Sequence, residues 1–261
     1  GFSPEFFKQA LLAVDAAKLP LAEEQTVEAL CDEVFPAIFD PAVMAKRVNQ
    51  ADGEDLVLTS ASYYYDGVTQ AEAEAFYNNL KDPKDETPVM YGMNSRLVKE
   101  NGKVVEKVWH TEGLYGEALS KVVYWLEKAL GVAENAEQKA VIEKLIKYYR
   151  SGSLEDFDDY CIAWVGDLDS RIDFVNGFTE SYGDPLGMKA SWESIVNFKD
   201  LEATKRTETI SSNAQWFEDN SPVDSRFKKE KVKGVTAKVI TAAILAGDLY
   251  PSTAIGINLP N

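Results

Sequence analysis

Apolar residues recur at helical spacing along most of residues 4–165, which predicts a chain rich in helix. Ser3-Pro4-Glu5 is typical of a helix start, because the serine caps free N–H groups, the proline fits the first turn and the acid lies at the positive end of the helix dipole. Thr69-Gln70-Ala71-Glu72 predicts another start, and Gly131 and Ser151-Gly152 predict helix ends. Beyond the first helix, the expected helices cover about 22–35, 42–48, 69–80, 115–130, 136–149 and 153–165.

Two pairs of segments carry the signature of antiparallel strands. Val89–Val98 and Val104–Trp109 flank Asn101-Gly102, two residues that accept the positive φ of a tight hairpin turn. Ile172–Tyr182 is rich in β-formers, and Ser191–Phe198 is its expected partner across a short turn. Together these patterns predict an α+β fold. The remaining expectations are a helix over 201–217, a mixed segment over 235–246 and an extended segment over 253–259.

The composition is that of an ordered, acidic protein. The chain has 261 residues, 45% of them hydrophobic, and a net charge of −16. Such a field repels nucleic acids and anionic membranes and attracts cations such as a protonated amine, although solubility alone also accounts for it. The sequence has no apolar run long enough to span a membrane. We expect a cytoplasmic location, since Gly1-Phe2-Ser3-Pro4 has no signal-peptide character, but a leader upstream of these residues would change this.

One strand end combines an acid with a phenol. Alternate side chains of a strand share a face, so Phe178, Glu180 and Tyr182 are expected to point the same way. The carboxylate suits an ammonium group, and the phenol O–H suits an oxyanion that develops during a reaction. An ordinary strand end at the surface gives the same pattern.

Two carboxamides lie near the end of the chain. Asn258 and Asn261 flank Leu259-Pro260, and the proline favours an extended backbone before it. An extended run of this kind can pair with a peptide by strand addition, while its amide oxygens accept hydrogen bonds from a terminal amine. A loop with two turn-forming asparagines is the simpler interpretation.

Other catalytic chemistry is sparse. His110 is the only histidine, so a zinc site with two histidines is excluded, and we expect it to be an ordinary structural residue. Cys31 and Cys161 lie far apart on apolar segments and are expected to be buried free thiols. The acids Glu180 and Asp184 resemble a glycosidase pair, but in so acidic a chain such pairs arise by chance.

Three segments resemble the dipeptidyl peptidase III family (peptidase family M49), which comprises zinc-dependent aminodipeptidases. They are Asp169-Ser170-Arg171-Ile172-Asp173, Gly177-Phe178-Thr179-Glu180-Ser181-Tyr182-Gly183-Asp184-Pro185-Leu186-Gly187 and Ile255-Gly256-Ile257-Asn258-Leu259-Pro260-Asn261. The helical first half is similar to the bacterial branch. The resemblance implies that Glu180 binds the free amine of an oligopeptide substrate and that Tyr182 contacts the scissile carbonyl and the tetrahedral intermediate.

The resemblance also implies roles for the last segment. Asn258 and Asn261 would complete the amine site, and the strand that includes Ala254 and Gly256 would pair with the substrate backbone. Family members have two lobes around a wide cleft. This chain corresponds to the lower, substrate-binding lobe, which is helix-rich around a mixed β-core, with a short helical excursion to the other lobe. We expect this lobe over 1–196, the excursion over 197–233 and the return with the substrate-pairing strand over 234–261.

Two departures from the family pattern limit what this chain can do alone. Gly183 stands where many relatives have arginine after the tyrosine, so this chain lacks that arginine at this position. The family's zinc motif, His-Glu-x-x-x-His, is absent, so we expect no metal bound by this chain and no hydrolysis without the zinc lobe of the same polypeptide. A non-catalytic acidic binding module is the alternative, and the gene sequence beyond Asn261 would distinguish the two.

Overall fold

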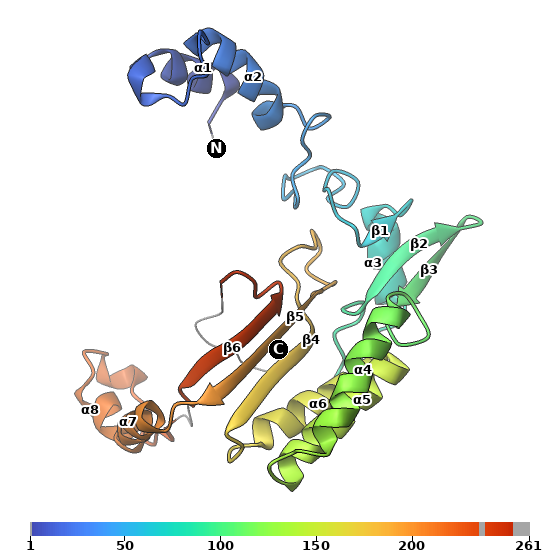
Figure 1. Ribbon diagram of the computed structural model, residues 1–261, viewed down its shortest axis with the longest axis vertical. Helices are drawn as coiled ribbons and strands as arrows, with labels where there is room; N and C mark the ends of the chain where they lie inside the picture. The colour runs from blue at the N-terminus through green and yellow to red at the C-terminus, as the bar shows by residue number, and fades with distance from the viewer. Residues whose placement is uncertain (1, 235–237, 253–261) are drawn as a thin grey trace.

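The computed structural model describes residues 2–234 and 238–252, and in them it confirms the α+β fold: helices are combined with two separate three-stranded sheets (Figure 1). No helix in this described part is long and apolar enough to cross a membrane. The helices are α1 (Pro4–Leu12), α2 (Val27–Phe39), α3 (Gln70–Asn78), α4 (Gly116–Leu130), α5 (Ala136–Ser151), α6 (Leu154–Gly166), α7 (Leu201–Ser212) and α8 (Ala214–Asn220), with 3-10 turns at Ala16–Lys18 and Ser225–Phe227. The strands are β1 (Tyr65–Asp66), β2 (Ser95–Glu100), β3 (Lys103–Val108), β4 (Ile172–Glu180), β5 (Ser191–Lys199) and β6 (Ile240–Gly247).

Helices α1 and α2 pack against each other and lie apart from the rest of the chain (Figure 1). Their contact is aromatic, since the rings of Phe7 and Phe39 meet edge to face at 5.5 Å and Phe35 lies 4.8 Å from Phe39. Ser3 caps α1 as expected. Helix α2 starts later than expected and continues through Pro36, and the helix expected over 42–48 is wrong because these residues form turns and bends.

Strands β2 and β3 form the expected hairpin. Asn101 and Gly102 both have positive φ, 52° and 78°, and hence occupy the turn that the Asn-Gly pair predicts. The first strand begins at Ser95 and not at Val89, because 91–94 is a turn. The short β1 adds to β2 in parallel, and α3 begins with a capping box between Thr69 and Glu72.

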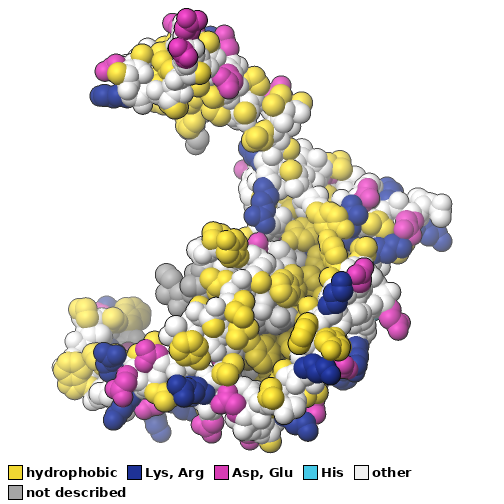
Figure 2. Space-filling view, in the orientation of Figure 1, with side chains coloured by type: hydrophobic (Ala, Val, Ile, Leu, Met, Phe, Trp, Pro, Cys, Tyr) yellow, Lys and Arg dark blue, Asp and Glu magenta, His cyan; other side chains and the backbone are white. Residues whose placement is uncertain are grey.

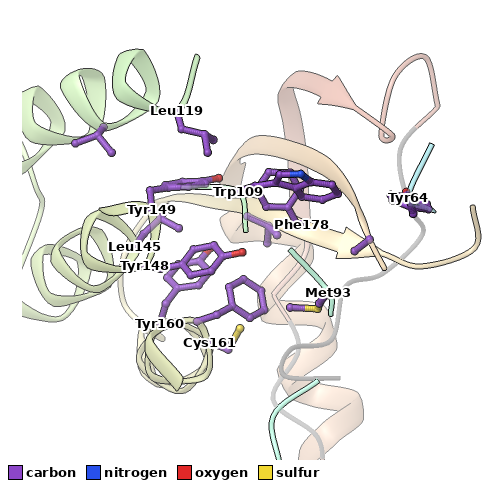
Figure 3. Close-up of a cluster of buried hydrophobic side chains, with 14 of the residues drawn as sticks. Tyr64, Met93, Trp109, Leu119, Leu145, Tyr148, Tyr149, Tyr160, Cys161 and Phe178 are labelled. Carbon is purple, nitrogen blue, oxygen red and sulfur yellow. The ribbon is translucent and has the colours of Figure 1, made fainter. Parts of the chain in front are cut away.

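Helices α4, α5 and α6 pack together beside the β4–β6 sheet (Figure 1). The buried core between them is aromatic: Trp109 and Phe178 lie against each other, and Tyr148, Tyr149 and Tyr160 lie to one side of them, on α5 and α6 (Figure 3). The rings of Trp109 and Phe178 are 4.6 Å apart. Cys31 and Cys161 are buried and free, as expected.

The sheet β4–β5–β6 is antiparallel throughout, with β5 in the centre. The ends of β4 and β6 therefore lie at the same end of the sheet as the beginning of β5. A bulge at Thr179 shifts the register between Phe178 and Glu180 there. Helices α7 and α8 lie at the opposite end (Figure 1), within the segment 197–233 whose crossing to a second lobe stays a prediction.

A buried lysine joins the loop between β4 and β5 to the other sheet. Lys189 is 0% exposed, and its Nζ donates to the Tyr77 hydroxyl at 2.6 Å and to Ser95 Oγ at 3.0 Å. The neighbouring Ala190 N–H donates to the carbonyl oxygen of Met93 at 2.8 Å. Burial lowers the pKa of Lys189 to about 8, although the Glu106 and Asp184 carboxylates oppose this.

Candidate functional site

Glu180 is the last residue of β4 and is half-buried at the end of the sheet. It pairs with Ser191, the first residue of β5, whose Oγ lies 3.1 Å from the carbonyl oxygen of Glu180. Burial raises the pKa of the Glu180 carboxyl, and the nearby Asp248 carboxylate raises it further. The sequence pattern placed Glu180 at a strand end, as observed.

Asp248 reaches the same place from the end of β6. The Ser191 hydroxyl donates to Asp248 Oδ2 at 2.5 Å, and the Asp248 N–H donates to the carbonyl oxygen of Trp192 at 3.1 Å. The preceding Gly247 has a φ of 63°, and a Cβ there would lie 2.1 Å from that same Trp192 oxygen. Only glycine fits this turn, which brings Asp248 to Ser191 and Glu180.

A third acid, Glu193, lies beneath these two. It is 4% exposed, and its Oε1 accepts a hydrogen bond from the Thr179 hydroxyl. Its Oε2 is buried without a hydrogen-bond partner among the described residues. Burial raises the pKa of Glu193, Thr179 lowers it, and the Glu180 and Asp248 carboxylates raise it again. The end of the sheet is thus a negative site that a single ammonium group would stabilise.

Tyr182 lies beyond the strand, so the expectation that it shares a strand face with Phe178 and Glu180 is wrong. Strand β4 stops at Glu180 after the bulge, and Tyr182 falls in a turn with its side chain 87% exposed. The phenol is therefore presented to solvent close to Glu180 along the chain.

Asp184 fixes the turn that carries Tyr182. Its Oδ2 accepts from the N–H groups of Met188 at 2.7 Å and Lys189 at 2.8 Å and from the Tyr65 hydroxyl at 3.0 Å. Asp184 is only 3% exposed. This carboxylate holds the loop and faces no open space, which argues against the glycosidase pairing with Glu180.

A guanidinium from another segment lies against Gly183. A Cβ at Gly183 would meet Arg47 Nη2 at 2.8 Å. Nearby, the Gln50 side-chain amide donates to the carbonyl oxygen of Pro185 at 3.1 Å. The loop around residue 47 therefore covers one side of the turn, and it supplies an arginine where the sequence has glycine.

Four expected site residues, Ala254, Gly256, Asn258 and Asn261, lie outside the described residues, so their placement stays a prediction. His110 is half-buried, and its Nδ1 accepts from the Glu112 N–H at 3.4 Å. Over 2–234 and 238–252, no group of three His, Cys, Asp or Glu side chains is arranged to hold a metal ion.

An aromatic pocket adjoins the acidic end of the sheet, and sequence reasoning missed it. It encloses about 430 Å³ between α4 and the β4–β5 strands, where Figure 2 shows hydrophobic side chains in a hollow. No sequence signal marked it, because its walls come from five separate stretches of the chain. The residues that line it are Tyr63, Tyr64, Trp109, Tyr115, Ala118, Leu119, Val122, Phe178, Ala190, Ser191 and Trp192.

Comparisons with known proteins agree with the sequence resemblance. A sequence profile described as peptidase family M49 matches residues 42–261. Dipeptidyl peptidase 3 of Dictyostelium discoideum is 32% identical over 149 residues, which are 57% of this chain and 21% of the relative. Nudix hydrolase 3 of Arabidopsis thaliana is 30% identical over 149 residues, 57% of this chain and 19% of that protein. The matched part thus spans about a fifth of each of these relatives.

A solved structure shares the fold. The structure of DPP III from Caldithrix abyssi aligns over 100% of this chain and 47% of its own, with a TM-score of 0.64 and 20% sequence identity. The arrangement of helices and sheets described above therefore also occurs as part of a larger protein.

Proposed function

Because the chain belongs to peptidase family M49, we propose that it is the substrate-binding part of a dipeptidyl peptidase. The complete enzyme would release dipeptides from the amino end of oligopeptides. The observation that carries this proposal is the meeting of Glu180, Asp248 and Ser191 at one end of the β4–β6 sheet.

In this proposal the acidic end of the sheet binds the free amine of the peptide. Glu180 pairs with the ammonium group, and Asp248 and the buried Glu193 add to its attraction. A bound cation would remove the repulsion among these carboxylates and stabilise their charged forms. A peptide whose amine is blocked brings no positive charge to offset the repulsion among these carboxylates, so the site excludes it. Because the site holds the free amine, cleavage falls at a fixed distance from the amino end.

Asn258 and Asn261 would complete the amine site, and Ala254 and Gly256 would pair with the substrate backbone. The end of β6 supports this, because Gly247 lies opposite Glu193 and the following Asp248 accepts a hydrogen bond from Ser191, at the same end of the sheet as Glu180. An extended chain advances at most about 3.5 Å per residue. Asn258 follows Asp248 by ten residues, so the length of the chain permits Asn258 to reach Glu180.

Tyr182 would donate its phenol O–H to the oxyanion of the tetrahedral intermediate. Its 87% exposure leaves the hydroxyl accessible to a peptide that lies across the sheet end. A positioned donor of this kind acts mainly in the transition state, because the charge it stabilises develops only there.

Zinc would be held by the other lobe of the same polypeptide, because the sequence of this chain lacks the family's His-Glu-x-x-x-His motif. When bound, zinc supplies a Lewis acid and an activated water. We expect the 261-residue chain alone to bind peptides without hydrolysing them, and the zinc lobe of the same polypeptide to be its partner.

The test uses the complete polypeptide that contains this chain. Tyr182→Phe should lower kcat roughly 100-fold with little change in KM, because it removes an interaction made in the transition state. Glu180→Gln should instead lower kcat/KM for every peptide with a free amine. The matched control is Tyr124→Phe, which changes a half-exposed tyrosine on α4 and should leave both constants unchanged.

An unchanged kcat in the Tyr182 variant would end its catalytic role. If the wild-type polypeptide released no dipeptide from any oligopeptide, the chain would be a binding module without chemistry, which is the alternative that the acidic composition leaves open.

A further inference from the structure

The aromatic pocket beside the acidic sheet end is a second binding element that the proposed function does not use. Its floor is made by Trp109 and Phe178, which are 3% and 4% exposed, and its rim by the half-exposed Tyr63 and Tyr115. A volume of about 430 Å³ lies in the range of small-molecule sites.

One edge of the pocket is polar and touches the amine site directly. Ser191 lines the pocket, and its hydroxyl donates to Asp248 Oδ2 at 2.5 Å and lies 3.1 Å from the Glu180 carbonyl oxygen. Burial raises the pKa of Tyr64, the neighbouring Ser191 hydroxyl lowers it, and the Asp184 and Asp248 carboxylates raise it. The phenol of Tyr64 therefore also lies near these acids.

The strand pairing also places the apolar part of the pocket next to the acidic end of the sheet. Phe178 pairs with Trp192 across β4 and β5, and the next pair along the strands is Glu180 with Ser191. The indole N–H of Trp109 is buried with no acceptor among the described residues, and the face of an aromatic ring can accept such a group weakly. Figure 3 shows Trp109 and Phe178 side by side, with Leu119 of α4 and Tyr64 on either side of them.

A ligand that fills both parts must carry a cation and a large apolar group a few atoms apart. The first residue of a peptide has this form, since its amine and its side chain share one carbon. We infer that the pocket takes the side chain of the substrate's first residue and selects large aromatic or aliphatic residues there. This inference rests on the proposed function of Glu180.

Binding by the 261-residue chain gives the first test. Trp109 and Trp192 line the pocket, so intrinsic fluorescence reports its occupancy. Phenylalanine amide should bind at least tenfold more tightly than glycine amide, which lacks the side chain, and than N-acetyl-phenylalanine amide, which lacks the cation. Equal affinity for phenylalanine amide and glycine amide would overturn the inference.

Kinetics of the complete enzyme give the second test, with two fluorogenic dipeptide substrates whose first residue is Phe or Gly. Ala118→Trp places a large ring in the pocket from an exposed position of α4 and should reduce the Phe-to-Gly ratio of kcat/KM at least fivefold. Ser120→Trp, two residues along the same helix and outside the pocket lining, should leave the ratio unchanged. Thermal melting establishes that both variants are folded.

The outcomes separate the two proposals. If the enzyme releases dipeptides but Ala118→Trp leaves the ratio unchanged, or lowers both substrates equally, the pocket has another occupant and only this inference fails. If no dipeptide is released from either substrate, the proposed function fails and the inference with it.

Discussion

At the residue scale, Asp184 matters for its buried hydrogen bonds and not for acid–base chemistry. Two backbone N–H groups and the Tyr65 hydroxyl converge on its Oδ2, and the Leu186 N–H reaches Oδ1 at 3.3 Å. These bonds fix the turn that carries Tyr182. A carboxylate that accepts several buried donors is costly to remove, because each donor is then left without a partner.

Asp184→Ala should therefore lower the free energy of unfolding by roughly 3 kcal/mol, as measured by chemical denaturation. Asp169→Ala is the matched control, since Asp169 is an exposed acid in the same half of the chain and should change stability by less than about 0.5 kcal/mol. Equal losses in the two variants would show that Asp184 does not hold the turn.

At the scale of elements, the loop between β4 and β5 is attached to the β1–β3 sheet through a buried cation. Lys189 donates to Tyr77 and Ser95, and the ring faces of Tyr65 and Tyr77 lie within 5.6 and 4.9 Å of its Nζ. The Lys189 amine is titratable, and burial makes its charged form less favourable in the folded protein than in the unfolded chain. The free energy of unfolding must therefore depend on pH.

Burial lowers the pKa of Lys189 from 10.5 to about 8. Below pH 8 the folded and unfolded states both carry the proton, whereas between about pH 8 and 10.5 the unfolded state binds more protons and stability rises with pH. Relative to Lys189→Met, the wild type should gain about 1 kcal/mol in free energy of unfolding from pH 7 to pH 9. A difference between the two proteins that stays constant over this range would contradict the shifted pKa.

The exposed Lys205 on α7 offers the matched control for this titration. Lys205→Met should show the same pH dependence of unfolding as the wild type over this range. Denaturation curves at several pH values for the three proteins would isolate the contribution of the buried amine.

Elements with strong local signals could be predicted from the sequence, and those set by distant contacts could not. The Asn101-Gly102 turn and the Thr69–Glu72 capping box are determined by side chains within a few residues of each other, and both appear in the structure. The bulge at Thr179 and the two-residue β1 depend on partners far along the chain, so no local pattern marked them. Pro36 led to the opposite error, since a proline predicts the end of a helix but α2 continues through Pro36 to Phe39.

The residues of the candidate site also divide into those that a local pattern marked and those that only the sheet brings together. Glu180 and Tyr182 stood out because two useful side chains lie close together in the sequence. Asp248 did not, since it joins Glu180 only through Ser191 and the antiparallel order of β4, β5 and β6. In a chain with 43 acids, a single aspartate carries no signal until the sheet places it.

At the scale of the whole molecule, α1 and α2 form a unit of their own. Phe7, Phe35 and Phe39 hold the two helices together, and Figure 1 shows the pair apart from the remainder. The family match also begins only at residue 42. The site and its supporting sheets therefore lie within the part that follows.

Removal of residues 1–41 should leave the unfolding free energy of the remaining chain within about 0.5 kcal/mol of that in the full chain, because independent units contribute additively. Near-ultraviolet circular dichroism and chemical denaturation of the shortened chain would measure this. Loss of a cooperative unfolding transition would show that α1 and α2 are an integral part of the lobe.

The approach of Arg47 to Gly183 couples two positions that are 136 residues apart in numbering. The guanidinium is the far end of a flexible side chain, so any side chain introduced at 183 must displace it before it can occupy the space beside the turn. A substitution at 183 should therefore be tolerated better where residue 47 is short, and we expect the residues at these two positions to covary in evolution.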